Sequence, residues 1–195
     1  MKKIIFATHN QGKVIEMRQI LAGLNVELIT AEEAGVLDDV LEDGKTFADN
    51  AFKKAKFVVA KTNEWALADD SGLCIDALGG KPGVYSARWA KDKDIVEHTL
   101  GLLKNVPKPE RGAYFETCAV LLSPQGKKYV FSGVVKGEIS LTPKGRPVPK
   151  LPYDVIFIPS GQTKTFAEMD KAEKNKLSHR GLALQKMIKV IKKLI

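Results

Sequence analysis

The chain has 195 residues, which suffices for one domain or two small lobes with a buried core. Hydrophobic residues make up 44% and charged residues 28%, a balance that excludes an intrinsically disordered chain. The net charge of +8 suggests an anionic partner such as a nucleotide, but nucleic-acid binding is not expected because aromatic residues do not interleave with basic ones. No signal peptide or membrane-spanning stretch is visible, and Cys74 and Cys118 are typical of buried, reduced thiols. We therefore expect a cytoplasmic protein without a membrane partner.

The first elements are predicted to be a strand, a polar loop and a helix. Lys3–Thr8 is a short apolar run, His9–Lys13 is polar, and apolar residues then recur at helical spacing over Val14–Leu24. Lys13 would lie in the first helical turn, where backbone N–H groups and the helix dipole attract an anion. We expect a phosphate site here, although most such loops only connect two elements. The loop is not a Walker A loop, because its Gly-x-x-x-x-Gly-Lys-Ser/Thr pattern is absent.

A second strand, Val26–Thr30, is followed by an acidic irregular segment and a second helix. Thr46 is predicted to be the N-cap of this helix, with Asp49 as its capping-box partner. Apolar residues at helical spacing continue the helix, and Lys54 lies among other lysines that are most simply a solvated face.

The central stretch of the chain places two carboxylates side by side. Trp65–Ala68 predicts a buried strand that stops at Asp69 and Asp70, with Ser71 and Gly72 as a turn. Adjacent strand residues point to opposite faces, so one carboxylate should face a site and the other should be held by hydrogen bonds. Buried carboxylates are unfavourable unless they are paired or bind a cation, which suggests a hard metal ion. The simpler interpretation is a turn that follows a strand.

The rest of the chain is predicted to be rich in strands and then helical. A helix is expected over Asp94–Leu103, and an extended loop over the proline-rich Pro143–Pro152. The strands expected are Ala113–Leu122, Lys128–Ser132, Val134–Ile139 and Tyr153–Ile158. Phe166–Met169 would start a helix, and the last helix follows Arg180. This order predicts an α/β fold with a mixed sheet and helices packed on it.

The separate hints agree on hydrolysis of a phosphoanhydride. Such a reaction needs cations against the developing charge, carboxylates that hold a metal, and a group that orients or deprotonates water. The carboxylates available are Glu42, Asp49, Asp69 and Asp70. A nucleophilic Ser178 activated by His179 is a weaker alternative, because adjacent helical residues do not face each other and no Gly-x-Ser-x-Gly elbow is present.

Five segments carry further motifs in a fixed order: Ala7–Lys13, Glu42–Ala51, Ala68–Leu73, Leu78–Arg88 and Ala172–Arg180. In these motifs, and over nearly its whole length, the chain resembles the inosine triphosphate pyrophosphatase family. The resemblance implies a long central mixed sheet, two lobes with a nucleotide cleft between them, and a homodimer. It also implies Mg²⁺-dependent cleavage of ITP, dITP and XTP to the monophosphate and pyrophosphate.

The resemblance assigns roles to residues by position. Asp70 would be the general base and a metal ligand, Glu42 the second carboxylate at the metal, and Ser71 a substrate contact beside it. The residues assigned to the substrate are Thr8, His9, Asn10, Gln11, Gly12 and Lys13 in the triphosphate loop, and Leu151, Pro152, Tyr153, Asp154, Lys174, His179 and Arg180 at the base. Asp49 and Asp69 are reserve carboxylates at the metal, and Lys54 and Ser178 are further candidate site residues. Donor side chains would donate hydrogen bonds to the carbonyl oxygen at purine position 6 and leave the amino group of adenine unpaired, which is unfavourable in a dry pocket.

Two departures from the family pattern bear on the substrate. Asp49 stands where the family has the longer Glu. The loop Pro147–Val155 has Leu151 where the family has a stacking Phe, and prolines where it has flexible glycines. Leu has no π face, so base stacking should be weaker, and proline fixes φ. Two alternatives therefore stay open: a pyrophosphatase of the same fold with a shifted base preference, and a nucleotide-binding protein without turnover.

Overall fold

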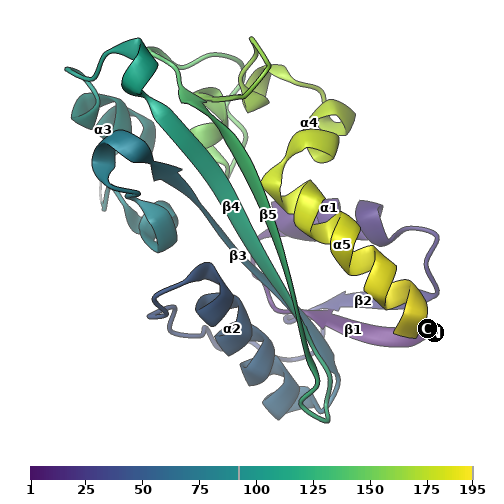
Figure 1. Cartoon of the computed structure of the whole chain (residues 1–195). Coiled ribbons are helices and arrows are strands. Elements are labelled where there is room, and N and C mark those ends of the chain that lie inside the picture. The colour runs from purple at the N-terminus through teal and green to yellow at the C-terminus, as the bar shows by residue number, and fades with distance from the viewer. Residues whose placement is uncertain (92, 195) are drawn as a thin grey trace. The chain divides into compact units, whose positions relative to one another are not determined.

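The computed structural model describes residues 1–91 and 93–194 (Figure 1). The strands are β1 (Lys2–Phe6), β2 (Val26–Thr30), β3 (Trp65–Ile75), β4 (Gly112–Leu122), β5 (Lys128–Ile139) and β6 (Phe157–Pro159). The α-helices are α1 (Gln11–Leu21), α2 (Phe47–Thr62), α3 (Ile95–Leu102), α4 (Lys171–Leu177) and α5 (His179–Leu194). None of the helices in the described ranges is long and apolar enough to cross a membrane.

The strands form one mixed sheet in the order β2-β1-β3-β4-β5-β6. β1 pairs in parallel with both β2 and β3, whereas β5 and β6 pair antiparallel. The predicted α/β class, with a mixed sheet and flanking helices, is therefore confirmed. By internal contacts the chain divides into two compact units. Unit 1 contains Met1–Asp70, Thr117–Ser132 and the segment from Ala183 onward, and unit 2 contains Ser71–Glu116 and Gly133–Leu182.

In unit 1, alternate residues of β3 belong to two different apolar clusters. Leu67 joins Met17 of α1 and Met187 of α5, whereas Ala66 and Ala68 join apolar residues of α2. Successive strand residues point to opposite faces of a sheet. One face of β3 is therefore covered by α1 and α5, the other by α2, and the two residues that follow Ala68 must face different helices.

The core of unit 2 is built around the ring of Phe115 on β4. Its centroid lies 6.4 Å from that of Tyr153, 4.7 Å from that of Phe157 and 6.1 Å from that of Phe166. The imidazole of His179 stacks on the same ring, with centroids 4.6 Å apart and an interplanar angle of 9°. The first residue of α5 is thus fixed against the aromatic core.

The strand predicted to stop at the two carboxylates is longer than expected. β3 continues through Asp69, Asp70, Ser71 and Gly72 to Ile75, so the predicted turn is wrong. β1 pairs with β3 only over Trp65–Leu67, and the other neighbour of β3 in the sheet is β4. Pairing with a neighbouring strand stabilises extended backbone, and this outweighs the turn propensity of Ser-Gly.

Other predicted boundaries also changed. Lys128–Ile139 is one strand instead of two, because Gly133 continues the strand. The strand predicted over Tyr153–Ile158 is wrong in its first part, since Pro152–Val155 is a 3₁₀ turn (η4), and only Phe157 and Ile158 lie in a strand, the short β6. Pro152 fixes a φ that suits a first helical turn. The helix predicted to start at Phe166 is only the 3₁₀ turn η5 (Phe166–Glu168).

Gly181 in α5 tests how tightly the start of that helix is packed. A Cβ added at Gly181 would collide with the backbone carbonyl oxygen of Asn175. We expect Gly181→Ala to lower the free energy of unfolding by about 1–3 kcal/mol, and the midpoint of thermal denaturation by about 2–4 °C for each kcal/mol. Circular dichroism measures both.

Gly101 provides the matched control. It lies in α3, where an added Cβ would meet nothing within 4 Å. Gly101→Ala should raise the midpoint, because alanine favours a helix over glycine by about 1 kcal/mol. Equal shifts in the two variants would contradict the close approach at Gly181.

Candidate active site

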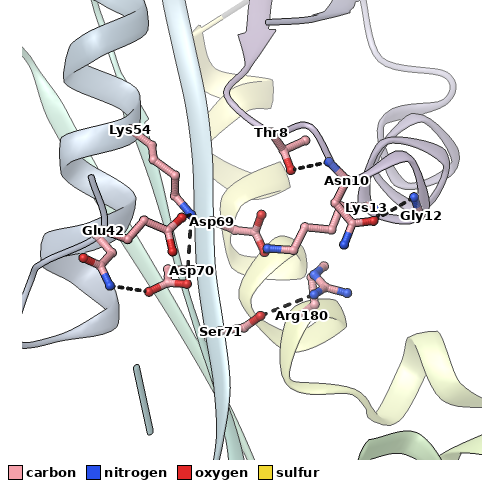
Figure 2. Close-up of polar contacts among 11 residues, drawn as sticks. Thr8, Asn10, Gly12, Lys13, Glu42, Lys54, Asp69, Asp70, Ser71 and Arg180 are labelled. Atoms are coloured by element: carbon pink, nitrogen blue, oxygen red, sulfur yellow. Dashed lines mark hydrogen bonds and ion pairs between the residues drawn. The ribbon is translucent and has the colours of Figure 1, made fainter. Parts of the chain in front are cut away.

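The loop after β1 places Lys13 in the first turn of α1 (Figure 2). Asn10 caps the helix: its side-chain oxygen accepts hydrogen bonds from the N–H groups of Gly12 at 2.9 Å and Lys13 at 3.4 Å. The N–H of Asn10 donates to Thr8 Oγ1 at 3.2 Å. The predicted arrangement of strand, polar loop and helix is therefore confirmed. Because Asn10 already uses two N–H groups, an arriving phosphate would compete with the cap for them.

Asp69 and Asp70 project from opposite sides of β3, as predicted (Figure 2). Asp69 Oδ2 lies 2.8 Å from Lys13 Nζ, and the Asp69 side chain is completely buried. Asp70 Oδ2 accepts a hydrogen bond from Asn50 Nδ2 on α2 at 2.9 Å. The carboxylates therefore have different partners, from α1 on one face and from α2 on the other.

Lys54 lies between two carboxylates. Its Nζ is 2.8 Å from Glu42 Oε1 and 3.9 Å from Asp70 Oδ1. Burial raises the pKa of the Asp70 carboxyl above its ordinary value, and Glu42 adds to the rise, while Lys54 and Asn50 oppose it. A buried carboxyl with a raised pKa beside a second carboxylate is a candidate general base.

Glu42 and Asp70 are the side chains that could hold a divalent cation. Across the described ranges, no group of three or more His, Cys, Asp or Glu side chains is arranged to hold a metal ion. Mg²⁺ does not need such a group, because it is usually bound by one or two carboxylates together with substrate phosphates and water. Two carboxylates that share a lysine fit that mode of binding.

Asp49, an additional candidate at this site, caps α2 instead. Its Oδ2 accepts from the Thr46 N–H at 3.1 Å, and its own N–H donates to Thr46 Oγ1 at 3.1 Å, so the predicted capping box is confirmed.

Asn50 is a site residue to which the sequence assigned no role. It is fully buried, and its side-chain oxygen also accepts from the Gly44 N–H at 2.8 Å. Its signal was the i, i+4 spacing to Lys54, which puts both side chains on one face of the helix.

The residues assigned to the base lie in unit 2. Asp154 of η4 forms an ion pair with Lys174 of α4. Arg180 donates from a terminal guanidinium nitrogen to Ser71 Oγ at 3.4 Å (Figure 2). His179, Arg180 and Asp154 are all buried. The turn η4 and the start of α5 therefore place cationic and donor groups in one unit, although they come from distant parts of the sequence.

Several predicted contact residues have structural partners. The Tyr153 hydroxyl donates to the Ser86 carbonyl at 2.9 Å, so this hydroxyl is used inside the protein. Ser178 Oγ accepts from the Gly181 N–H at 3.1 Å and is buried, which makes it a helix-capping group. The exposed His9 lies 3.5 Å from Asp39, and Gln11 and Gly12 are also exposed. Leu151 and Pro152 are partly exposed at the start of η4.

The order of these motifs and this fold are known from other proteins. The sequence profile of the Ham1 family matches residues 4–190. The chain belongs to the Ham1 family. The dITP/XTP pyrophosphatase of Bacillus subtilis is 42% identical over 196 residues, which cover 98% of each chain. That of Geobacter sulfurreducens is 45% identical over 188 residues, or 94% of each chain.

Solved structures of Ham1 proteins have the same fold as this chain. A HAM1 protein from Coxiella burnetii superposes with a TM-score of 0.90 at 36% identity, over 99% of this chain and 100% of that one. The Ham1 protein of Staphylococcus aureus gives a TM-score of 0.88 at 33% identity, over 100% of both chains. The resemblance inferred from five motifs is thereby confirmed, together with the fold that it implied.

The two adjacent carboxylates should respond oppositely to neutralisation. The pKa of Asp70 is raised in the folded chain, so ionised Asp70 lowers folded stability at neutral pH, and this loss is relieved as pH falls through the folded-state pKa. Asp70→Asn should therefore raise the midpoint of thermal denaturation at neutral pH by about 2–4 °C for each kcal/mol gained. The gain should shrink as the pH is lowered.

Asp69→Asn is the matched comparison. It removes the partner of Lys13, whose own side chain is largely buried. Leaving a buried polar group without its partner costs about 1–3 kcal/mol, so the midpoint should fall. A lowered midpoint in both variants, measured by calorimetry across the same pH series, would contradict the raised pKa of Asp70.

Proposed function

We propose that this chain hydrolyses dITP, ITP and XTP to the nucleoside monophosphate and pyrophosphate. The names of the relatives from Bacillus subtilis and Geobacter sulfurreducens support this activity. The observation that carries the proposal is the environment of Asp70, a buried carboxyl with a raised pKa between Asn50 and Lys54. Hydrolysis needs a base of this kind to take a proton from water.

The residues of unit 1 would carry the chemical step. Asn50 holds Asp70 Oδ2, which leaves Oδ1 on the side of Lys54. The carboxylate would orient the attacking water and accept its proton. Lys54 and Lys13 would stabilise the negative charge that develops on the phosphate oxygens.

We also propose that the enzyme uses Mg²⁺, held by Glu42 and Asp70. The bound ion would neutralise phosphate oxygens and lower the pKa of a bound water. Lys54 would meanwhile keep the two carboxylates partly neutralised, which reduces their repulsion. A homodimer in the cytoplasm remains part of the proposal, and light scattering after size exclusion would measure the oligomeric state.

Unit 2 would select the base. His179, Arg180 and Lys174 would donate hydrogen bonds to the carbonyl oxygen at purine position 6. Adenine presents an amino group there, so donor would face donor. A site built to hydrogen-bond one group disfavours an analogue that cannot complete those bonds, because its own buried polar groups are left unpaired.

Pyrophosphate release from ITP, XTP, dITP, GTP and ATP with Mg²⁺ tests the function. We expect release from the first three substrates and a loss of about 10²–10⁴-fold in Asp70→Asn. Equal release from all five would show that base selection is lost. No release from any substrate would overturn the enzyme proposal and leave a nucleotide-binding protein.

Glu42→Gln tests the second metal carboxylate. We expect a lower rate and a higher Mg²⁺ concentration for half-maximal activity, because a neutral amide binds Mg²⁺ more weakly than a carboxylate does. Asp43→Asn is the matched control, since Asp43 is the adjacent residue and forms its own exposed ion pair with Lys53. An unchanged Mg²⁺ requirement in Glu42→Gln would remove Glu42 from the metal site.

A further inference from the structure

The loop between β5 and η4 carries positive charge without a carboxylate. From Ile139 to Tyr153 the sequence contains Lys144, Arg146 and Lys150 and no acidic residue, and all three cations are exposed. Arg146 and Lys150 take part in none of the salt bridges found among the described residues. Their charges are therefore available to a ligand.

This loop is anchored within unit 2. The Lys144 N–H donates to the Val155 carbonyl at 2.8 Å, and Thr165 Oγ1 donates to the Lys144 carbonyl at 3.3 Å. Gly145, with φ +79, packs so closely on Ala167 that an added Cβ would clash with its backbone. The loop is thus tied to both η4 and η5.

Lys150 occupies a backbone conformation that favours glycine. Its φ is +64, and it is the third residue of a turn closed by the hydrogen bond from the Leu151 N–H to the Val148 carbonyl at 3.0 Å. Pro149 precedes it, and this turn position normally takes glycine when φ is positive. The backbone conformation disfavours a lysine at this position. Residues held in disfavoured conformations cluster at functional sites, so we look for a role of the Lys150 side chain in binding.

The neighbours of Lys150 in the sequence connect the loop to the residues assigned to the base. Lys150 directly precedes Leu151, the N-cap of η4, and η4 contains Asp154, the ion-pair partner of Lys174. The two bases considered for this site differ in charge. Hypoxanthine is neutral at physiological pH, whereas the xanthine base of a nucleotide loses a proton close to neutral pH and becomes an anion.

We infer that Arg146 and Lys150 favour the anionic base of xanthine nucleotides over the neutral base of inosine nucleotides. The inference rests on the proposed function, because it takes η4 as part of the base site. An exposed ion pair of this kind changes an affinity by about 1.4–5-fold. The preference should therefore be modest for each cation and should weaken as ionic strength rises.

The other charged groups that pack against the loop belong to the elements around it. The pKa of Glu168 is lowered mainly by the hydrogen bond from the Thr165 N–H, with smaller effects of Lys144 and Lys164. Lys144 is thus partly offset by a carboxylate of η5, and Asp154 is offset by its ion pair. Of the three cations in the loop, Arg146 and Lys150 are the ones left to act on a base.

Calorimetric titration of the whole chain with XMP and IMP tests the inference without turnover. In the unsubstituted protein the affinity ratio of XMP to IMP should rise from mildly acidic to mildly alkaline pH, as xanthine ionises. Lys150→Gln and Arg146→Gln should each lower the ratio at alkaline pH by about 1.4–5-fold. Lys150→Arg should keep it, because the charge remains.

Lys192→Gln is the matched control for charge loss, since Lys192 is an exposed lysine in the last turn of α5. The affinity ratio of XMP to IMP in this variant should equal that of the unsubstituted protein. An unchanged ratio in the double variant Arg146→Gln/Lys150→Gln, or equal weakening of XMP and IMP, would overturn the inference. If the unsubstituted protein released no pyrophosphate but still preferred XMP in a manner that depends on Arg146 and Lys150, only the proposed activity would be overturned.

Discussion

Two carboxylates on adjacent residues of a buried strand must be neutralised from opposite faces of the sheet, and unit 1 is arranged around that constraint. Asp69 meets Lys13 from α1, and Asp70 meets Asn50 and Lys54 from α2. Ionised carboxylates in an apolar interior are strongly unfavourable without such partners. The loop that starts α1 and the capped start of α2 therefore both serve to bring a cation or donor to β3.

The two carboxylates are neutralised to different extents, which suits Asp69 to a structural role and Asp70 to a catalytic one. Asp69 has a close cation at 2.8 Å, whereas Lys54 Nζ lies 3.9 Å from Asp70 Oδ1 and also pairs with Glu42. Burial consequently dominates at Asp70 and raises its pKa. A closer lysine would stabilise the fold but would also lower that pKa and weaken the base, a common conflict between stability and activity at functional sites.

The base end follows a different principle, because aromatic packing positions its polar groups. His179 is held by the face of Phe115, and the Tyr153 hydroxyl is held by the Ser86 carbonyl. These contacts join residues that are distant in sequence, so periodicity and spacing could not reveal them. The same holds for the length of β3, since only its place beside β4 in the sheet explains why Ser-Gly stays extended.

The sequence by itself determined the α/β class, the strand Val26–Thr30, the capped start of α2 and the family, because each depends on local patterns or on motifs in a fixed order. It also placed Asp69 and Asp70 on opposite faces, since the two-residue period of a strand requires it. Only the tertiary structure decided which partner each carboxylate meets and that Asn50 completes the site. Those choices depend on which helix covers which face of the sheet, and that is a property of packing between distant segments.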